Sequence, residues 1–186
     1  MSYSHIIGID GASARQPEHD RVAIVGAAYV DGRLEEILTD SVAHDGDDGT
    51  DVMVRLVRQS GHLNQAELIM LTDITFAGFN VIDLRQLSER LSSPVLVCAL
   101  RPPDREALKK SLLGYVKNGR EKWARIAALG PMQPIAGLYA HLIGLSNSTA
   151  KQIIERTSTH GFMPDPLRTA RLVASGLEDG LSVGAS

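Results

Sequence analysis

The sequence predicts an α/β fold, a mixed sheet in which a three-strand antiparallel meander precedes parallel strands, with helices on both faces. Three observations support this prediction. Three strand-like segments follow one another closely within the first 42 residues. The apolar run at 68–71 has no polar face, as expected for a strand that is buried on both sides. After residue 50, segments with helical spacing alternate with short apolar runs, an order that places helices over both faces of a sheet.

The composition is that of a protein with a sizeable core. The chain has 186 residues, of which 44% are hydrophobic, and we expect one domain over 1–186. Its single cysteine, Cys98, lies inside an apolar run, so we expect a buried and inert thiol. No segment reaches the roughly 18 apolar residues of a membrane helix, and the first residues show no signal pattern. A cytoplasmic protein without membrane contact is therefore expected.

Charge is spread unevenly along the chain. Residues 1–83 contain 14 acidic and 5 basic residues, whereas residues 84–186 contain 8 acidic and 14 basic residues. One interpretation is an acidic, metal-binding end beside a basic patch that contacts nucleic acid. The other is that solvated charges are distributed unevenly without function. Both stay open, because the net charge of −3 is low for a protein that clamps nucleic acid over its whole surface.

The meander is predicted by its turns. Its strands are expected at 5–10, 21–30 and 33–42. Asp10 ends the first strand, and Asp31-Gly32 between the other two is a strong hairpin signal. The acidic segment 44–51 follows. It lacks the glycine and glutamate positions of a calcium-binding loop.

The later elements alternate between helix and strand. Thr50 or Asp51 is expected to cap a helix that ends near residue 60. A buried strand over 67–72 then delivers Asp73 and Asn80 to its exposed carboxyl end, where open α/β sheets bind ligands. The remaining elements are expected as a helix at 83–91, a strand at 94–100, helices from about 102 and from 119, a strand or helix at 135–143, a helix at 146–158 and a terminal helix from 164.

The basic residues offer weaker signals than the acids. Arg101, Arg105 and Lys109 follow a four-residue spacing, so they would share a side that contacts phosphate if their helix begins near residue 102. Arg168 lies early on the terminal helix and could pair with an acid at the site or only with Asp165. The histidines show no metal-ligand spacing; they are His5, His19, His44, His62, His141 and His160.

Several motifs resemble an archaeal family known as domain of unknown function ninety-nine, which is itself similar to endonuclease V. The motifs that carry the resemblance are Ile7-Gly8-Ile9-Asp10, Asp45-Gly46 with Thr50, the stretch 74–84, Pro103-Asp104, Gly144-Leu145-Ser146 with Ala150, and Pro164-Asp165-Pro166-Leu167-Arg168. They cover nearly the whole chain, and the stretch 74–84 is the most specific of them.

The resemblance implies a ribonuclease-H-like fold and metal-dependent cleavage of nucleic acid. It implies that carboxylates at the ends of the first and central strands hold a divalent metal, and we therefore take Asp10, Asp45 and Asp73 as candidate ligands of Mg²⁺ or Mn²⁺, with Asp48 as a further catalytic acid. Asn80, Arg101 and Arg168 are the corresponding candidates for binding substrate. Such acids suit the chemistry, because hard cations prefer oxygen ligands and can stabilise both the attacking and the leaving oxygen of a phosphodiester.

This chain departs from the family at its acids. Relatives carry two acids where it has Asp10-Gly11, and the position of the central-strand acid is Thr72, with Asp73 one place later. In a strand, one residue turns a side chain to the other face. The metal site therefore loses a ligand unless the strand ends before residue 73. No counterpart of the tyrosine-x-proline-glycine wedge of endonuclease V is present, so deoxyinosine specificity does not carry over.

Each candidate also has a structural interpretation. Asp10 could form a turn with Gly11, and Asp73 could bind nearby backbone at a strand end. Asp45 and Asp48 could belong to a solvated loop. Helix caps are the structural alternatives for Asp51, Asp83 and Asp165. Two hypotheses follow: a divalent-metal-dependent phosphodiesterase with a degenerate carboxylate set, or a non-catalytic ribonuclease-H-like module that binds protein or nucleic acid.

Overall fold

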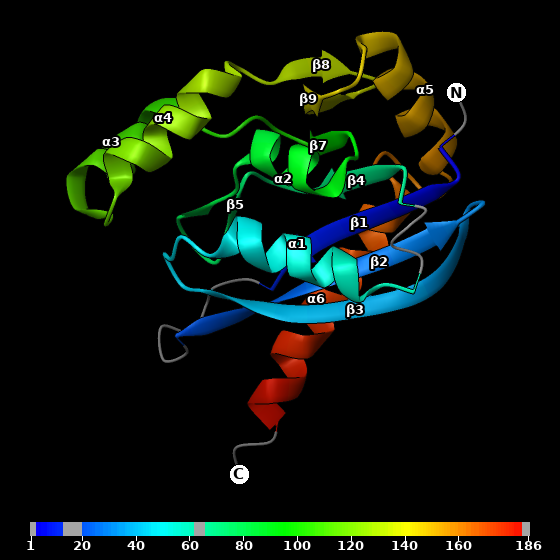
Figure 1. The fold of residues 1–186 in the computed structure, drawn as a ribbon, viewed down its shortest axis with the longest axis horizontal. Helices are drawn as coiled ribbons and strands as arrows, with labels where there is room; N and C mark the ends of the chain where they lie inside the picture. The colour runs from blue at the N-terminus through cyan, green and yellow to red at the C-terminus, as the bar shows by residue number, and fades with distance from the viewer. Residues whose placement is uncertain (1–2, 13–19, 62–65, 184–186) are drawn as a thin grey trace.

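A computed structural model describes residues 3–12, 20–61 and 66–183. Over these residues the chain forms a seven-stranded sheet, a separate two-stranded hairpin and six helices (Figure 1). The strands of the large sheet lie in the order β3-β2-β1-β4-β7-β9-β8. No helix in these ranges is long and apolar enough to cross a membrane.

The predicted meander forms the first half of the sheet. Its strands are β1 (His5–Gly11), β2 (Arg21–Val30) and β3 (Arg33–Ala43), and both pairings are antiparallel. Asp31 and Gly32 have positive φ angles of 49° and 79°, as the tight turn between β2 and β3 requires. The prediction of three strands joined at an Asp-Gly turn is confirmed.

Two parallel strands continue the sheet beyond β1. β4 (Leu68–Leu71) pairs with β1 in a parallel register that places Ile9 beside Leu71, and β7 (Val95–Ala99) pairs in parallel with β4. The hairpin β8 (Gln133–Ile135) and β9 (Leu138–Ile143) completes the sheet, with β9 antiparallel to β7. The ambiguous segment 135–143 is therefore a strand.

Helices cover both faces of the sheet, as predicted. One face packs on α1 (Gly49–Gln59) and α2 (Leu84–Leu91), and the other packs on α5 (Asn147–Thr157) and α6 (Asp165–Val183). Within β4, Ile69 and Leu71 face the first pair, while Leu68 and Met70 face the second. A strand with apolar residues on both faces is what the unbroken run predicted. Cys98 is also buried, and burial raises the pKa of its thiol to about 12.

The helices α3 (Arg105–Tyr115) and α4 (Gly119–Leu129) follow β7 and pack against each other. They lie at the end of the sheet toward which β1, β4 and β7 run (Figure 1). Asp104 caps α3 by accepting hydrogen bonds from the backbone N–H groups of Glu106 and Ala107. The predicted start of α3 near residue 102 is therefore three residues too early.

A short hairpin follows β4, where the sequence predicted only a strand end. Its strands are β5 (Thr75–Phe76) and β6 (Asn80–Val81). Ala77 and Gly78 in its turn have φ angles of 46° and 82°. A Cβ atom on Gly78 would lie 2.2 Å from Asp45 Oδ1, so only glycine fits this close approach.

Candidate functional site

Asp10 lies at the carboxyl end of β1, beside the first residue after β4. The parallel register of β1 and β4 brings Thr72 next to it, and the Thr72 hydroxyl donates a hydrogen bond of 2.6 Å to Asp10 Oδ1. The backbone N–H of Gly11 donates to the same oxygen at 2.8 Å. Asp10 is only 7% exposed. Asp10 thus forms the hydrogen bond to Gly11 that its structural interpretation predicted, and it also lies at the strand end where a ligand could bind.

Arg171 on α6 supplies the positive charge next to Asp10. Its Nε donates a hydrogen bond of 2.9 Å to Asp10 Oδ2, and its side chain is 53% exposed. Sequence reasoning missed this residue. The available signal was its spacing on the terminal helix, because Arg171 follows Ala170 and lies three residues before Ala174, and both alanines are buried against the sheet.

Asp73 lies beside the same strand end, after β4 has stopped at Leu71. Its Oδ1 accepts hydrogen bonds from the N–H groups of Ile74 at 2.6 Å and Thr75 at 3.3 Å. Although part of the residue is open to solvent, crowding by protein atoms raises the pKa of the Asp73 carboxyl, and the negative charge of Asp10 raises it further. The condition set by the sequence is met: the strand ends before residue 73, so the two acids can act on one another.

A small cavity of about 90 Å³ adjoins Asp73. Arg101 and His141 also line it, so Arg101 does lie at this end of the sheet. Burial lowers the pKa of the His141 imidazole, and the charge of Arg105 lowers it further. His141 is therefore a neutral side chain near pH 7. We call Asp10, Thr72, Asp73 and Arg171 the strand-end site.

Phe76 packs closely against Gly11, the residue that follows Asp10. A Cβ atom on Gly11 would lie 2.9 Å from Phe76 Cδ1, which is closer than real Cβ contacts allow. Phe76 is 4% exposed and belongs to the core, so its ring has little freedom to move away. The hairpin β5–β6 therefore occupies the space that a side chain at position 11 would need.

The carboxylates of the acidic loop, residues 44–48, contact other parts of the protein and do not join the strand-end site as further ligands would. Asp48 accepts hydrogen bonds from Asn80 Nδ2 at 2.7 Å and from the N–H of Ala43 at 3.1 Å, and it pairs with Arg21 at 3.1 Å. Although burial alone would raise the pKa of Asp48, these hydrogen bonds and the charge of Arg21 outweigh it and lower that pKa. Asp48 also occupies the N-cap position of α1 without a side-chain cap bond. The predicted capping by Thr50 or Asp51 is therefore wrong.

Asp45 is attached to the same hairpin. Its Oδ1 accepts a hydrogen bond of 2.8 Å from the N–H of Phe79. Beneath it, the fully buried Lys122 donates from Nζ to the carbonyl oxygens of Asp45 at 2.8 Å and Gly46 at 2.9 Å, and lies 3.5 Å from Asp47 Oδ1. Nothing in the sequence pattern indicated this lysine, because its partners lie more than 70 positions away.

Asn80 is buried, which corrects its predicted exposed position. Its Nδ2 donates to the Ala43 carbonyl at 3.0 Å as well as to Asp48, and its Oδ1 accepts from the N–H of Gly49 at 3.0 Å. The hairpin turns the chain back before residue 80, so this amide joins the acidic loop to the start of α1. Substrate would not reach it without movement of these elements.

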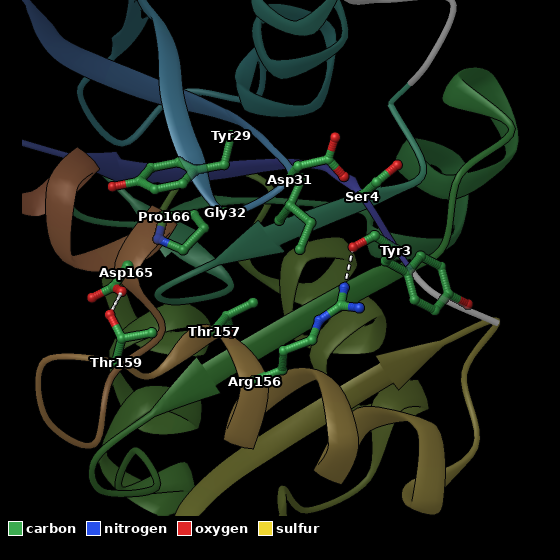
Figure 2. A pocket seen from close by; sticks show the side chains of 11 residues that line it. Tyr3, Ser4, Tyr29, Asp31, Gly32, Arg156, Thr157, Thr159, Asp165 and Pro166 are labelled. Carbon is green, nitrogen blue, oxygen red and sulfur yellow. Dashed lines mark hydrogen bonds between the residues drawn. The ribbon is translucent and has the colours of Figure 1, made fainter.

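The other predicted basic side chains have partners on the protein. Arg168 Nε lies 3.3 Å from Asp165 Oδ1, the simpler of its two expected pairings. Asp165 is the first residue of α6 rather than its cap. Its carboxylate accepts a hydrogen bond from the Thr159 hydroxyl, and both residues line a cavity of about 350 Å³ (Figure 2). The expected row of three bases does not form: Arg101 precedes α3, whereas Arg105 and Lys109 stack on Trp123 at 5.4 Å and 5.6 Å.

In the ranges that the structure covers, no three His, Cys, Asp or Glu side chains form a group that could hold a metal ion. Asp10 and Asp73 lie at the carboxyl ends of the adjacent parallel strands β1 and β4, but Asp45 and Asp48 bond to other groups. His19 and His62 lie outside the described residues. The predicted set of three acids is thus reduced to two.

The fold resembles that of endonuclease V, a ribonuclease-H-like nuclease. Endonuclease V of Ciona intestinalis, solved in complex with a 24mer DNA containing an inosine followed by a ribo-adenosine, has a TM-score of 0.62 at 10% identity, over 96% of this chain and 87% of that one. Endonuclease V of Bacillus subtilis has a TM-score of 0.64 at 9% identity, over 97% and 83%. The predicted ribonuclease-H-like fold is confirmed.

A family model described as endonuclease dU matches residues 2–178, so the chain belongs to that family. A UPF0215 protein of Deinococcus radiodurans is 40% identical over 182 residues, covering 97% of this chain and 92% of the relative. A protein of unknown function from Archaeoglobus fulgidus has a crystal structure with a TM-score of 0.86 at 28% identity, over 94% and 98%. The resemblance predicted from the motifs is confirmed, and family and fold together support a nuclease-like role.

Proposed function

We propose that this protein is an endonuclease that cleaves phosphodiester bonds with the help of a divalent cation, Mg²⁺ or Mn²⁺, bound by a reduced carboxylate set. The observation that carries the proposal is the pair Asp10 and Asp73 at the carboxyl ends of two adjacent parallel strands, close enough for one charge to raise the pKa of the other. Ligands in open α/β sheets bind at this edge.

The two acids suit Mg²⁺, which binds through one or two carboxylates and completes its shell with water and substrate phosphate. A cation between them would also relieve their mutual repulsion. When bound, it would supply charge stabilisation at the phosphate and lower the pKa of a bound water. Asp45 is not needed as a ligand in this arrangement.

The chain's own residues orient the site. Thr72 and the N–H of Gly11 fix Asp10 Oδ1, which leaves Oδ2 toward Arg171. The guanidinium of Arg171 uses Nε for Asp10, and its half-exposed side chain leaves nitrogen atoms that can donate to a substrate phosphate. Arg101 lies on the Asp73 side and can contact a neighbouring phosphate.

The family description supports a proposal for the substrate class. Its model is described as endonuclease dU, and we infer that the preferred substrate is DNA that contains deoxyuridine. The inosine-containing DNA held by the Ciona protein is the natural comparison substrate.

The proposal is tested with labelled duplexes that contain one deoxyuridine, one deoxyinosine or neither, incubated with Mg²⁺ or Mn²⁺. We expect cleavage of the deoxyuridine duplex, and a loss of about 100-fold or more for Asp10→Asn, because removal of charge stabilisation at a reacting phosphate has effects of that size. Glu35→Gln is the matched control, since Glu35 is exposed on β3, and it should cleave normally.

The non-catalytic module remains the competing function, favoured by Arg171 on Asp10 and by Thr72 at the family's acidic position. The two differ in their response to metal. A bound cation raises the melting temperature by mass action. If Mg²⁺ and Mn²⁺ support no cleavage and shift the melting temperatures of the protein and of Asp10→Asn equally, the module is the correct function.

A further inference from the structure

Unpaired cations collect on one region of the molecule. Of the seven described arginines outside the segment 85–125, four have a carboxylate partner: Arg21 pairs with Asp48, Arg55 with Asp40, Arg168 with Asp165 and Arg171 with Asp10. Within 85–125, by contrast, no ion pair or hydrogen bond joins six basic side chains to another described residue, whereas Arg33 is the one described arginine or lysine outside this segment of which the same is true. These six are Arg85, Arg101, Lys110, Lys117, Arg120 and Arg125.

These six residues lie at the start of α2, shortly after β7, on the helices α3 and α4, and in the connection between those two helices. Residues 101–129 contain eight basic and three acidic residues, and one of those acids, Asp104, is used as a helix cap. Five of the six side chains are exposed, and Arg125 is half-buried. Like charges held together without counter-ions on the protein produce a positive potential that attracts a polyanion.

Arg85 and Arg125 come from different helices but line the same groove in this region. Both line a groove of about 300 Å³ between the start of α2 and α4, together with Ala124, Ala128 and Asp83, whose carboxylate caps α2. The small alanine side chains leave room for a group of phosphate size beside the two guanidinium groups. Arg101, at the other end of the region, lines the small cavity that contains Asp73. The unpaired cations therefore extend from the strand-end site to the α2–α4 groove.

We propose that these six residues, the basic surface, contact the phosphate backbone of nucleic acid, with the Arg85–Arg125 groove as a phosphate subsite. The choice of nucleic acid as the ligand of this surface rests on the proposed endonuclease function. Figure 1 places α3 and α4 at the sheet end toward which β1 runs, and Asp10 lies at that end of β1, so a nucleic-acid strand bound at the site can continue along this surface. Phosphate contacts of this kind position a nucleic acid without reading its sequence.

The test measures binding without cleavage. A fluorescent 24-base-pair duplex without damage is titrated with protein in EDTA, and the anisotropy gives Kd between about 50 and 200 mM salt. The double variant Arg85→Gln/Arg125→Gln should bind at least about tenfold more weakly, and the slope of log K against log salt should fall by about 2, since each phosphate contact contributes about 0.9. The triple variant Lys110→Gln/Lys117→Gln/Arg120→Gln, in which every changed side chain is exposed, should lower the slope as well.

Arg33→Gln is the control, because Arg33 is exposed and unpaired with any described residue but lies at the β2–β3 turn, near the opposite end of the sheet. It should leave both Kd and slope unchanged. Equal losses for Arg33→Gln and the double variant would overturn the proposal in favour of bulk charge, as would unchanged binding by both multiple variants or no binding by the natural sequence. Since no metal is present, failure here is distinct from failure to cleave.

Discussion

The acidic loop and the strand-end site both contain several carboxylates, but they compensate negative charge differently. Asp48 in the loop accepts hydrogen bonds from Asn80 and Ala43 and pairs with Arg21, and its pKa is lowered. Asp73 at the strand end is exposed, yet crowding by nearby protein atoms raises its pKa, and the charge of Asp10 raises it further. Asp48 is thus held by a cation and hydrogen bonds that lower its pKa, whereas the pKa of Asp73 is raised despite the hydrogen bonds that it accepts, and perturbed pKa values of this kind cluster at functional sites.

The largest effect is expected at the buried lysine beneath the acidic loop. Lys122→Met keeps most of the apolar stem but removes the ammonium group that holds Asp45, Gly46 and Asp47. The loop carbonyls and Asp47 then lose their donor, and we expect the free energy of unfolding to fall by about 3 kcal/mol.

Urea denaturation measures this loss. Lys117→Met is the control, because Lys117 is exposed and should change the stability by less than about 0.5 kcal/mol. Similar values for the two variants would mean that Lys122 does not hold the loop.

A smaller effect is expected when the family's second acid is restored. Gly11→Asp places a Cβ atom against the ring of Phe76, and we expect the free energy of unfolding to fall by about 2 kcal/mol through overpacking. The change should be measured by thermal and urea unfolding.

The double variant Gly11→Asp/Phe76→Leu identifies the cause. If the ring is the obstacle, the cost of Gly11→Asp should be smaller in the Phe76→Leu background. An equal cost in both backgrounds would assign the loss to charge repulsion with Asp10 instead.

The smallest effects should have opposite signs in the two regions. Asp48→Asn should lower the stability near pH 7 by about 1 kcal/mol, since it weakens charge-assisted hydrogen bonds. Asp73→Asn should raise the stability, because it removes a desolvated charge that Asp10 repels and keeps an oxygen for the N–H groups of Ile74 and Thr75.

The pH dependence follows from the directions of the pKa shifts. The contribution of Asp48 is present above its unfolded pKa of about 4 and is lost as the pH falls through its lowered folded pKa. For Asp73 the sign is reversed: stability falls as the pH rises from about 4 through its raised folded pKa. Unfolding curves measured between about pH 3 and pH 8 separate the two cases, and a stabilising Asp48→Asn or a destabilising Asp73→Asn would contradict this comparison.

The features that sequence predicted well are those determined by local pattern. The meander follows from its Asp-Gly turn, and β4 follows from a run that is apolar on both faces. The position of Asp10 at a strand end follows from the same reasoning, although its role in catalysis stays a prediction. The expectation of one domain over 1–186 also stays a prediction.

The features that prediction from sequence missed depend on contacts with residues far away in the chain. Lys122 is buried because loop carbonyls some 76 positions earlier accept its hydrogen bonds. Asn80 was expected at an exposed end because Ala77-Gly78 lies inside an apolar run that gave no hairpin signal. Arg171 reaches Asp10 only because α6 packs across β1, a tertiary contact that helical spacing alone does not specify.

The β5–β6 hairpin touches both regions at once. Phe76 on its first strand lies against Gly11, while Phe79 and Asn80 after its turn hold Asp45 and Asp48. The length of the hairpin therefore sets the separation between the end of β1 and the acidic loop. An insertion in the turn Ala77–Phe79 would displace either Phe76 from Gly11 or Asn80 from the acidic loop. The seven residues of the hairpin, 75–81, therefore act as a spacer whose length cannot change without disturbing one of the two regions.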